Sequence, residues 1–238
     1  MTKTRIILAG CLLLLNEGPL HADPVPLVVQ YSDPLIVIGG LGGGRFQAVL
    51  GNDPVHVYCI DFSHYFKFNS PYWVDVTPLY GDVAGQTRWG SVGISGWTFA
   101  NNQFTALQRY MMAAWLTTQY LPFFANWSDP NSQYQAKGIQ SAIWALLDPS
   151  GVPNPPASGN RDYWLQQAMH TITLPDYDEA TDPFYRYFRV VSPQIPTANT
   201  PQEFIIQVTP EPASFVLITG ALGWLGLTRL RQRRGAKR

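Results

Sequence analysis

The chain has 238 residues, of which 46% are hydrophobic, and this is enough for one domain with a substantial core, or one domain with a subdomain. Its 16 basic and 16 acidic residues balance, but eight of the basic and only two of the acidic residues lie in residues 1–22 and 210–238. Residues 23–209 therefore keep eight basic and 14 acidic residues, a net charge of −6, which does not fit nucleic acid as a partner.

Residues 1–22 have the pattern of a secretory signal peptide. Two basic residues precede an apolar segment at positions 6–15, and Ala22 supplies the small residue that a cleavage site needs. The apolar segment is too short for a membrane span, which takes roughly 20 residues. An alternative interpretation places a lipid on Cys11, which ends a Leu-Ala-Gly-Cys sequence, but the apolar segment continues beyond it. We therefore expect an exported chain whose mature part begins at residue 23.

Residues 35–97 are expected to be mainly β-strand. Residues 51–54, Gly-Asn-Asp-Pro, have strong turn chemistry and predict a hairpin between the strands on either side. The glycine-rich residues 39–44 are expected to form a loop, but no Lys-Ser/Thr pair or helix follows, so they do not predict a phosphate site. The expected strands are residues 35–38, 45–50, 55–62 and 72–76.

Residues 101–170 are expected to be helical. Apolar residues at helical spacing predict a first helix over about residues 107–118. The second helix has a clear start, because Asp129 is a favourable N-cap and Pro130 suits the first helical position. A third helix is expected at residues 161–170.

The strand pattern returns in residues 185–208, with strands expected at residues 185–191 and 203–208. Strands on both sides of a helical region predict an α+β fold. We expect a β-sandwich or barrel-like sheet in residues 23–209, with residues 101–170 as an inserted helical subdomain.

Residues 210–238 have three parts in a fixed order. Pro210, Glu211 and Pro212 come first, an apolar segment at residues 213–227 follows, and six basic residues end the chain. A short apolar helix with a basic end is held in a membrane with its charges on the cytoplasmic side. The three parts together resemble the PEP-CTERM sorting signal of Gram-negative bacteria.

This resemblance implies a route for the chain. An exosortase-type peptidase would process the tail while the C-terminal helix holds the chain transiently in the inner membrane. The product would then reach the cell surface or the extracellular matrix, where it is either anchored or released. An ordinary C-terminal membrane anchor is the alternative interpretation.

Loss of the signal peptide leaves Cys59 as the one cysteine of the mature chain. Exported proteins usually carry cysteines in pairs, because oxidising compartments favour disulfides. A lone exported thiol is expected to be buried, paired between chains or used chemically. Cys59 is predicted to lie on a strand, where it shares a face with Asp61.

Two segments resemble the thioester domains of bacterial surface adhesins. They are Tyr58-Cys59-Ile60-Asp61, expected on a strand, and Ile139-Gln140-Ser141-Ala142-Ile143-Trp144, expected on the second helix. The likeness covers about residues 35–208, and one departure is Ile139, where the family usually has threonine. The resemblance implies an internal thioester between Cys59 and Gln140, formed without a cofactor, that couples the protein once to an amine-bearing target.

The resemblance also suggests roles for neighbouring side chains. Asp61 is the candidate base or orienting group for the Cys59 thiol, since the thiolate is the nucleophile. A thioester must be kept from water. Tyr58, Trp144 and Trp115 are the candidate shielding residues. The alternative for each is an ordinary core aromatic, and for Trp115 we favour that interpretation.

Two alternatives stay open. The domain is a passive surface or matrix protein if no thioester forms, because free cysteine is among the most buried residue types. It is a cysteine hydrolase if Cys59 attacks a substrate with a histidine as base. The candidate bases are His56, His64 and His170. The acidic residues Asp176, Asp178 and Glu179 are expected to form a solvated turn, so no metal site is predicted.

Overall fold

The computed structural model describes residues 23–81, 83–90, 104–147, 160–173, 182–194 and 201–208. It confirms the α+β class: six antiparallel strands form a closed barrel in the order β1-β2-β3-β6-β5-β4. The strands are β1 (Val25–Ile38), β2 (Leu41–Leu50), β3 (Asp53–Cys59), β4 (Pro71–Pro78), β5 (Phe188–Pro193) and β6 (Phe204–Gln207). The signal peptide and the sorting tail lie outside the described residues.

The first strand is much longer than the sequence predicted. β1 begins at Val25, ten residues before the expected strand at residues 35–38. Its first residues pair with β4, and most of its length pairs with β2, so this one strand joins two neighbours and closes the barrel. Closure leaves no unpaired sheet edge within the barrel.

The glycine-rich segment is mostly strand, so the predicted loop at residues 39–44 is wrong beyond its first two residues. Gly39 and Gly40 have φ angles of 58° and 84°, which glycine adopts readily, and they form the turn between β1 and β2. From Leu41 onward the chain pairs with β1. The sequence misled because glycine normally weakens a strand, whereas here a helix packs closely over the glycines.

The predicted hairpin over residues 45–62 is confirmed in outline. β2 and β3 pair from Arg45 opposite Tyr58 to Leu50 opposite Asp53, and Gly51 turns the chain at a φ of 64°. β3 ends at Cys59, three residues earlier than expected.

The helical region is inserted between β4 and β5, as the sequence predicted. Thr105 and Gln108 form a capping box at the start of α2 (Ala106–Thr118). At the start of α4, the carboxylate of Asp129 accepts hydrogen bonds from the backbone N–H groups of Asn131 and Ser132, which confirms its predicted role as a cap. The helices are α1 (Val83–Gln86), α2 (Ala106–Thr118), α3 (Leu121–Phe124), α4 (Pro130–Leu147) and α5 (Asn160–Ile172).

The return to β structure begins later than expected. Residues Pro183–Tyr187 form a 3-10 helix, not the start of a strand. Asp182 caps this 3-10 helix by accepting a hydrogen bond of 2.9 Å from the Phe184 N–H. Pro183 is the first residue of the helix, a position that suits proline because its φ angle is already fixed near the helical value. β5 therefore starts at Phe188.

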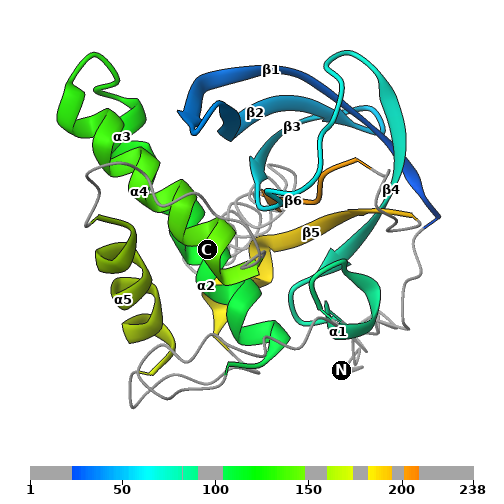
Figure 1. Cartoon of the computed structure of the whole chain (residues 1–238). Coiled ribbons are helices and arrows are strands. Elements are labelled where there is room, and N and C mark those ends of the chain that lie inside the picture. The colour runs from blue at the N-terminus through cyan, green and yellow to red at the C-terminus, as the bar shows by residue number, and fades with distance from the viewer. Residues whose placement is uncertain are drawn as a thin grey trace, which may run out of the picture.

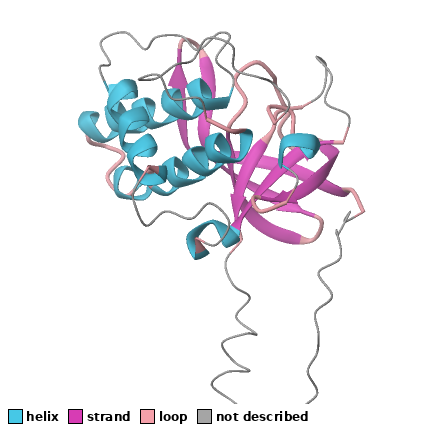
Figure 2. Ribbon diagram, turned by 90° about the horizontal axis from the view of Figure 1, so that it is seen from below, coloured by secondary structure: helices cyan, strands magenta, loops and turns pink. Residues whose placement is uncertain are grey.

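Helices α2, α3, α4 and α5 pack on one side of the barrel, whereas α1 lies near β4 and contacts both β4 and α2 (Figures 1 and 2). α4 lies between α5 and the strands, contacts α2 along its length, and reaches β1 and β2. Its residues from Gly138 to Leu147 are all buried, so α4 is the central element of the core. Within the described ranges, no helix is both long and apolar enough to cross a membrane.

Candidate functional site

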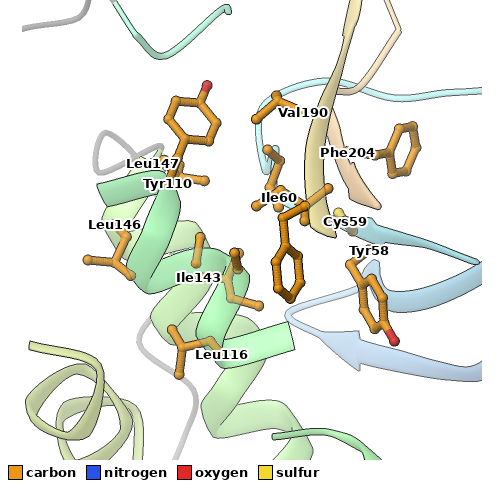
Figure 3. Close-up of a cluster of buried hydrophobic side chains, with 14 of the residues drawn as sticks. Tyr58, Cys59, Ile60, Tyr110, Leu116, Ile143, Leu146, Leu147, Val190 and Phe204 are labelled. Carbon is orange, nitrogen blue, oxygen red and sulfur yellow. The ribbon is translucent and has the colours of Figure 1, made fainter. Parts of the chain in front are cut away.

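Cys59 is the last residue of β3, at the junction of the barrel and the helices. Figure 3 shows it on the strand side of this junction, with Ile143 of α4 on the helix side. The side chain is completely buried and forms no disulfide. Because β3 ends here, the alternation of faces expected to continue to Asp61 does not apply, and Tyr58, Cys59, Ile60 and Asp61 are all buried.

Gln140 lies in the middle of α4 and is also completely buried, deeper than the core edge that its sequence position suggests. Its side-chain Nε2 donates a hydrogen bond of 2.9 Å to the backbone carbonyl of Cys59. Its Oε1 accepts two hydrogen bonds, from the Gly44 N–H at 2.6 Å and the Tyr120 hydroxyl at 2.9 Å. The fold thus brings the two predicted site residues together.

The two donors on Gln140 Oε1 resemble an oxyanion hole. Such donors stabilise negative charge that develops on a carbonyl oxygen during acyl transfer. Burial raises the pKa of Tyr120 well above its usual value, so its hydroxyl stays protonated and remains a donor. The Gly44 N–H is fixed in β2 and needs no rearrangement. Both groups therefore suit a tetrahedral intermediate at the Gln140 carbon.

Gly43 makes room for the carboxamide. A Cβ atom placed on Gly43 would lie 2.8 Å from Cδ and 2.9 Å from Oε1 of Gln140, closer than real Cβ contacts. Only glycine at this position lets α4 bring the carboxamide against β2. The glycine-rich segment thus contributes both space and a donor to the site.

The Cys59 thiol faces two oxygen acceptors. Its Sγ donates to the backbone carbonyl of Asp61 at 3.5 Å and to Oε1 of Gln202 at 3.6 Å. Burial raises the pKa of Cys59 to about 12. The indole N–H of Trp144 lies near the sulfur and lowers the pKa of Cys59 by part of this rise. Within the described part of the chain, Trp144 Nε1 is buried and completes no hydrogen bond. The resting thiol is therefore protonated.

Asp61 does not direct its carboxylate at the thiol. The carboxylate pairs with the Arg88 guanidinium and accepts a 2.9 Å hydrogen bond from His64 Nδ1 and a 3.3 Å bond from the Glu203 N–H. The backbone carbonyl of Asp61, by contrast, accepts from both Cys59 and Gln202. Of the two expected roles, this geometry supports the orienting role and not that of a base.

Glu203, whose backbone N–H bonds to the Asp61 carboxylate, is completely buried. Its carboxylate accepts hydrogen bonds from Tyr110 at 2.6 Å, from the Arg88 N–H at 2.8 Å, and from Ser192. Burial raises the pKa of Glu203 to about 7 despite these bonds. The cluster ties β6, β5 and α2 to the segment that carries Asp61.

Two of the three candidate shielding residues lie beside Cys59 and Gln140. The Tyr58 ring stacks on Tyr120, with 6.0 Å between centroids and 5° between planes, and Trp144 contacts Phe62 at 5.1 Å. Trp115 is placed elsewhere: it contacts Trp164 of α5, at 6.5 Å between centroids. Tyr58 and Trp144 therefore lie beside the candidate site, whereas Trp115 belongs to the packing of α2 on α5.

The geometry gives no support for a cysteine hydrolase. His64 bonds to Asp61, His56 bonds to Gln47 at 2.6 Å, and His170 is exposed at the end of α5. None of them bonds to Cys59 among the described residues. The same part of the chain contains no group of three potential metal ligands, and Asp176, Asp178 and Glu179 lie outside it.

Sequence reasoning missed three contributors to the site. Tyr120 and Gly44 bind the Gln140 oxygen, and Gln202 contacts the Cys59 sulfur. The unusual run of glycines signalled a close approach of backbone and side chain. Nothing local marked Tyr120 or Gln202, because each acts only through distant partners.

Cys59 and Gln140 form a buried pair that links α4 to the barrel. Comparisons with protein-family models, with curated proteins and with solved structures find no match for this chain. The chemistry open to this pair therefore follows from its contacts, burial and charge.

Proposed function

We propose that the mature chain is an exported surface or matrix protein in which Cys59 and Gln140 join as an internal thioester that attaches the chain covalently to amine-bearing targets. The observation that carries the proposal is the clamp on Gln140. Two donors hold its carboxamide oxygen, while its nitrogen is held at Cys59. This arrangement polarises one amide beside the one cysteine of the mature chain.

The thioester forms in one balanced step. The Cys59 sulfur bonds to Cδ of Gln140, the Cδ–Nε2 bond breaks, and the thiol proton moves to the nitrogen, which leaves as ammonia. During the attack, negative charge collects on Oε1 and is stabilised by Gly44 and Tyr120. Because burial keeps the thiol protonated, transfer of its proton to the leaving nitrogen removes the need for a separate base.

Gln140 is a better acyl donor than Gln202, the second glutamine beside the thiol. The Gln202 oxygen accepts only the Cys59 thiol within the described residues, whereas its nitrogen donates to Asp61. An amide oxygen with one weak sulfur donor is less polarised than one with an N–H and an O–H donor. We therefore assign Gln202 to orienting the thiol.

Attack by an amine on the thioester carbon would free the Cys59 thiol and leave an amide at Gln140. The chain would thus modify itself once and would not turn over as an enzyme. Because Cys59 and Gln140 are fully buried, a small amine is the appropriate first probe of the bond. The sorting tail, processed by an exosortase-type peptidase, would deliver the thioester to amines outside the cell.

Intact-mass measurement tests the proposal. We expect the full chain to be lighter than its sequence by one ammonia, and methylamine treatment to add one methylamine. Cys59→Ala and Gln140→Ala should abolish both changes, whereas Gln202→Ala, which alters the glutamine whose Oε1 lies 3.6 Å from the sulfur, should keep the deficit. A wild-type mass that equals the sequence mass, with no methylamine adduct, contradicts the proposal.

A second candidate function is a passive surface or matrix protein in which no thioester forms. The raised pKa of Cys59, about 12, favours this alternative, because a protonated thiol is a poor nucleophile. The same mass measurement decides between the two candidates. A chain without the deficit would have Cys59 as an inert core residue.

A further inference from the structure

A cleft of about 360 Å³ lies on the helical side of the molecule, between α3, α4 and α5. This volume falls within the range of small-molecule sites. Its lining residues are Phe123, Asn131, Gln135, Asn160, Tyr163 and Trp164. Three are uncharged amides, three are aromatic, and none carries a charge. The cleft faces away from Gln140, which α4 directs at the barrel.

Gly138 allows the floor of the cleft to form. A Cβ atom at this position would lie 2.9 Å from Nδ2 of Asn160 and 3.0 Å from Cδ1 of Trp164. Glycine thus lets the start of α5 approach α4 closely. The approach buries the Asn160 and Trp164 side chains, which are only 7% and 8% exposed.

The amides of the floor are held in fixed orientations. Oε1 of Gln135 accepts hydrogen bonds from Asn160 Nδ2 at 2.8 Å and Trp164 Nε1 at 3.2 Å. Both bonds use the Gln135 oxygen. Within the described residues, Nε2 of Gln135 remains available as a donor and Oδ1 of Asn160 as an acceptor. The side-chain amide of exposed Asn131 has no hydrogen-bond partner among the described residues. Gln135 and Asn160 therefore offer an uncharged donor and an uncharged acceptor in fixed orientations, and Asn131 adds an uncharged amide at the surface.

Aromatic rings line the cleft beside these amides. The Trp164 ring meets Tyr163 edge-to-face at 5.3 Å and Phe123 edge-to-face at 6.0 Å. Tyr163 is half exposed, so part of its surface is accessible to a ligand. Aromatic rings are large, rigid contact surfaces that lose little conformational entropy on binding.

We propose that this cleft binds a neutral saccharide. A sugar ring has an apolar face of C–H groups, which packs on aromatic rings, and a rim of hydroxyls, which both donate and accept hydrogen bonds as amides do. An acidic ligand would leave its charge without a basic partner in the lining. An extended peptide is less suited, because binding by strand addition needs a free sheet edge and the barrel is closed.

Saturation-transfer NMR on the full chain, in a detergent without a sugar headgroup, tests this site. The probes are cellobiose, lactose and N,N′-diacetylchitobiose, with digalacturonic acid and tetraproline as acidic and peptide probes. We expect transfer to the C–H protons of at least one neutral disaccharide and none to the other two probes. Tyr163→Ala should weaken binding about tenfold, from loss of one aromatic contact. Asn131→Ala should weaken it too.

Two controls keep the test specific. Tyr65→Ala removes a tyrosine that is 71% exposed and does not line the cleft, and it should leave binding unchanged. Every variant should keep the wild-type circular dichroism spectrum. Relative to its own sequence mass, it should also show the same mass deficit, or lack of one, as the wild type. The proposal is overturned if no neutral disaccharide shows transfer, if transfer survives both cleft substitutions, or if only the acidic or peptide probe binds.

Discussion

The side-chain nitrogen of Gln140 donates a hydrogen bond of 2.9 Å to the backbone carbonyl of Cys59, 81 residues earlier in the chain. The bond joins the middle of α4 to the end of β3, across the junction of helices and barrel. Since the oxygen of the same carboxamide is held by two donors on its other side, the group cannot rotate without losing buried hydrogen bonds. Gln140 is thus preorganised beside the cysteine, and the first three predictions concern its surroundings.

Tyr120→Phe removes one of the two donors to the Gln140 oxygen. We expect thioester formation to slow by on the order of 10²-fold, the usual cost of losing one oxyanion donor. The measurement is the time course of ammonia loss by intact mass after refolding. Tyr110→Phe is the matched control, because it removes another buried hydroxyl bond, to Glu203, away from the thiol. Equal rates for the two variants would exclude a role for Tyr120.

Gly43→Ala places a methyl group within 3 Å of the Gln140 side chain. We expect the carboxamide to be displaced, with loss of the thioester and a destabilisation of about 1–3 kcal/mol from overpacking. Gly42→Ala is the control, since its added carbon would meet only the flexible end of Leu35, at 3.2 Å. Urea unfolding and intact mass measure both effects. A Gly43→Ala variant that keeps the mass deficit would contradict this role.

Cys59 should resist alkylation in the folded chain whether or not a thioester is present. The side chain is buried, and burial raises its pKa to about 12, so almost no reactive thiolate is available. Iodoacetamide labelling therefore becomes informative only in urea. There a free thiol should react at once, whereas a thioester should react only after methylamine has been added. Rapid labelling of the folded wild type, mapped to the peptide containing Cys59, would contradict the burial.

Glu203 should make the fold less stable as the pH rises. Its pKa is about 7 in the folded chain and near 4.5 in the unfolded chain, so between these values the folded chain holds a proton that the unfolded chain has released. The free energy of unfolding therefore falls by about 3 kcal/mol across this window and levels off above it. The charged and titratable groups that face the Glu203 carboxyl group are Arg88, Tyr110 and Asp61.

Urea unfolding at pH 4.5 and pH 8 measures this dependence. Glu203→Gln should flatten the difference between the two pH values, because the amide does not titrate and still accepts a hydrogen bond. Asp53→Asn, at an exposed carboxylate on the β2–β3 hairpin, should leave the difference as in the wild type. If Glu203→Gln has the same pH dependence as the wild type, the buried carboxyl is not its source.

Local sequence patterns determined the parts of the fold whose cause is local. Asp129 and Pro130 marked the start of α4 because capping and proline geometry act within one turn. The turn after β2 was visible for the same reason. The two segments around Cys59 and Gln140 identified the residues of the candidate site, although Asp61 contacts the thiol through its backbone carbonyl and not through its carboxylate. The signal peptide and the sorting tail stay predictions from residues 1–22 and 210–238.

The surroundings of the site were decided by tertiary structure. Gly44 and Gln140 are 96 residues apart, and their hydrogen bond exists only because β2 and α4 pack together. A glycine run that locally disfavours a strand became strand once it had to accommodate a buried carboxamide. Hydrophobic periodicity shows which face of a helix is buried, but not which distant donor meets it. The hydrogen-bond partners of Gln140 depend on how the barrel packs against the helices.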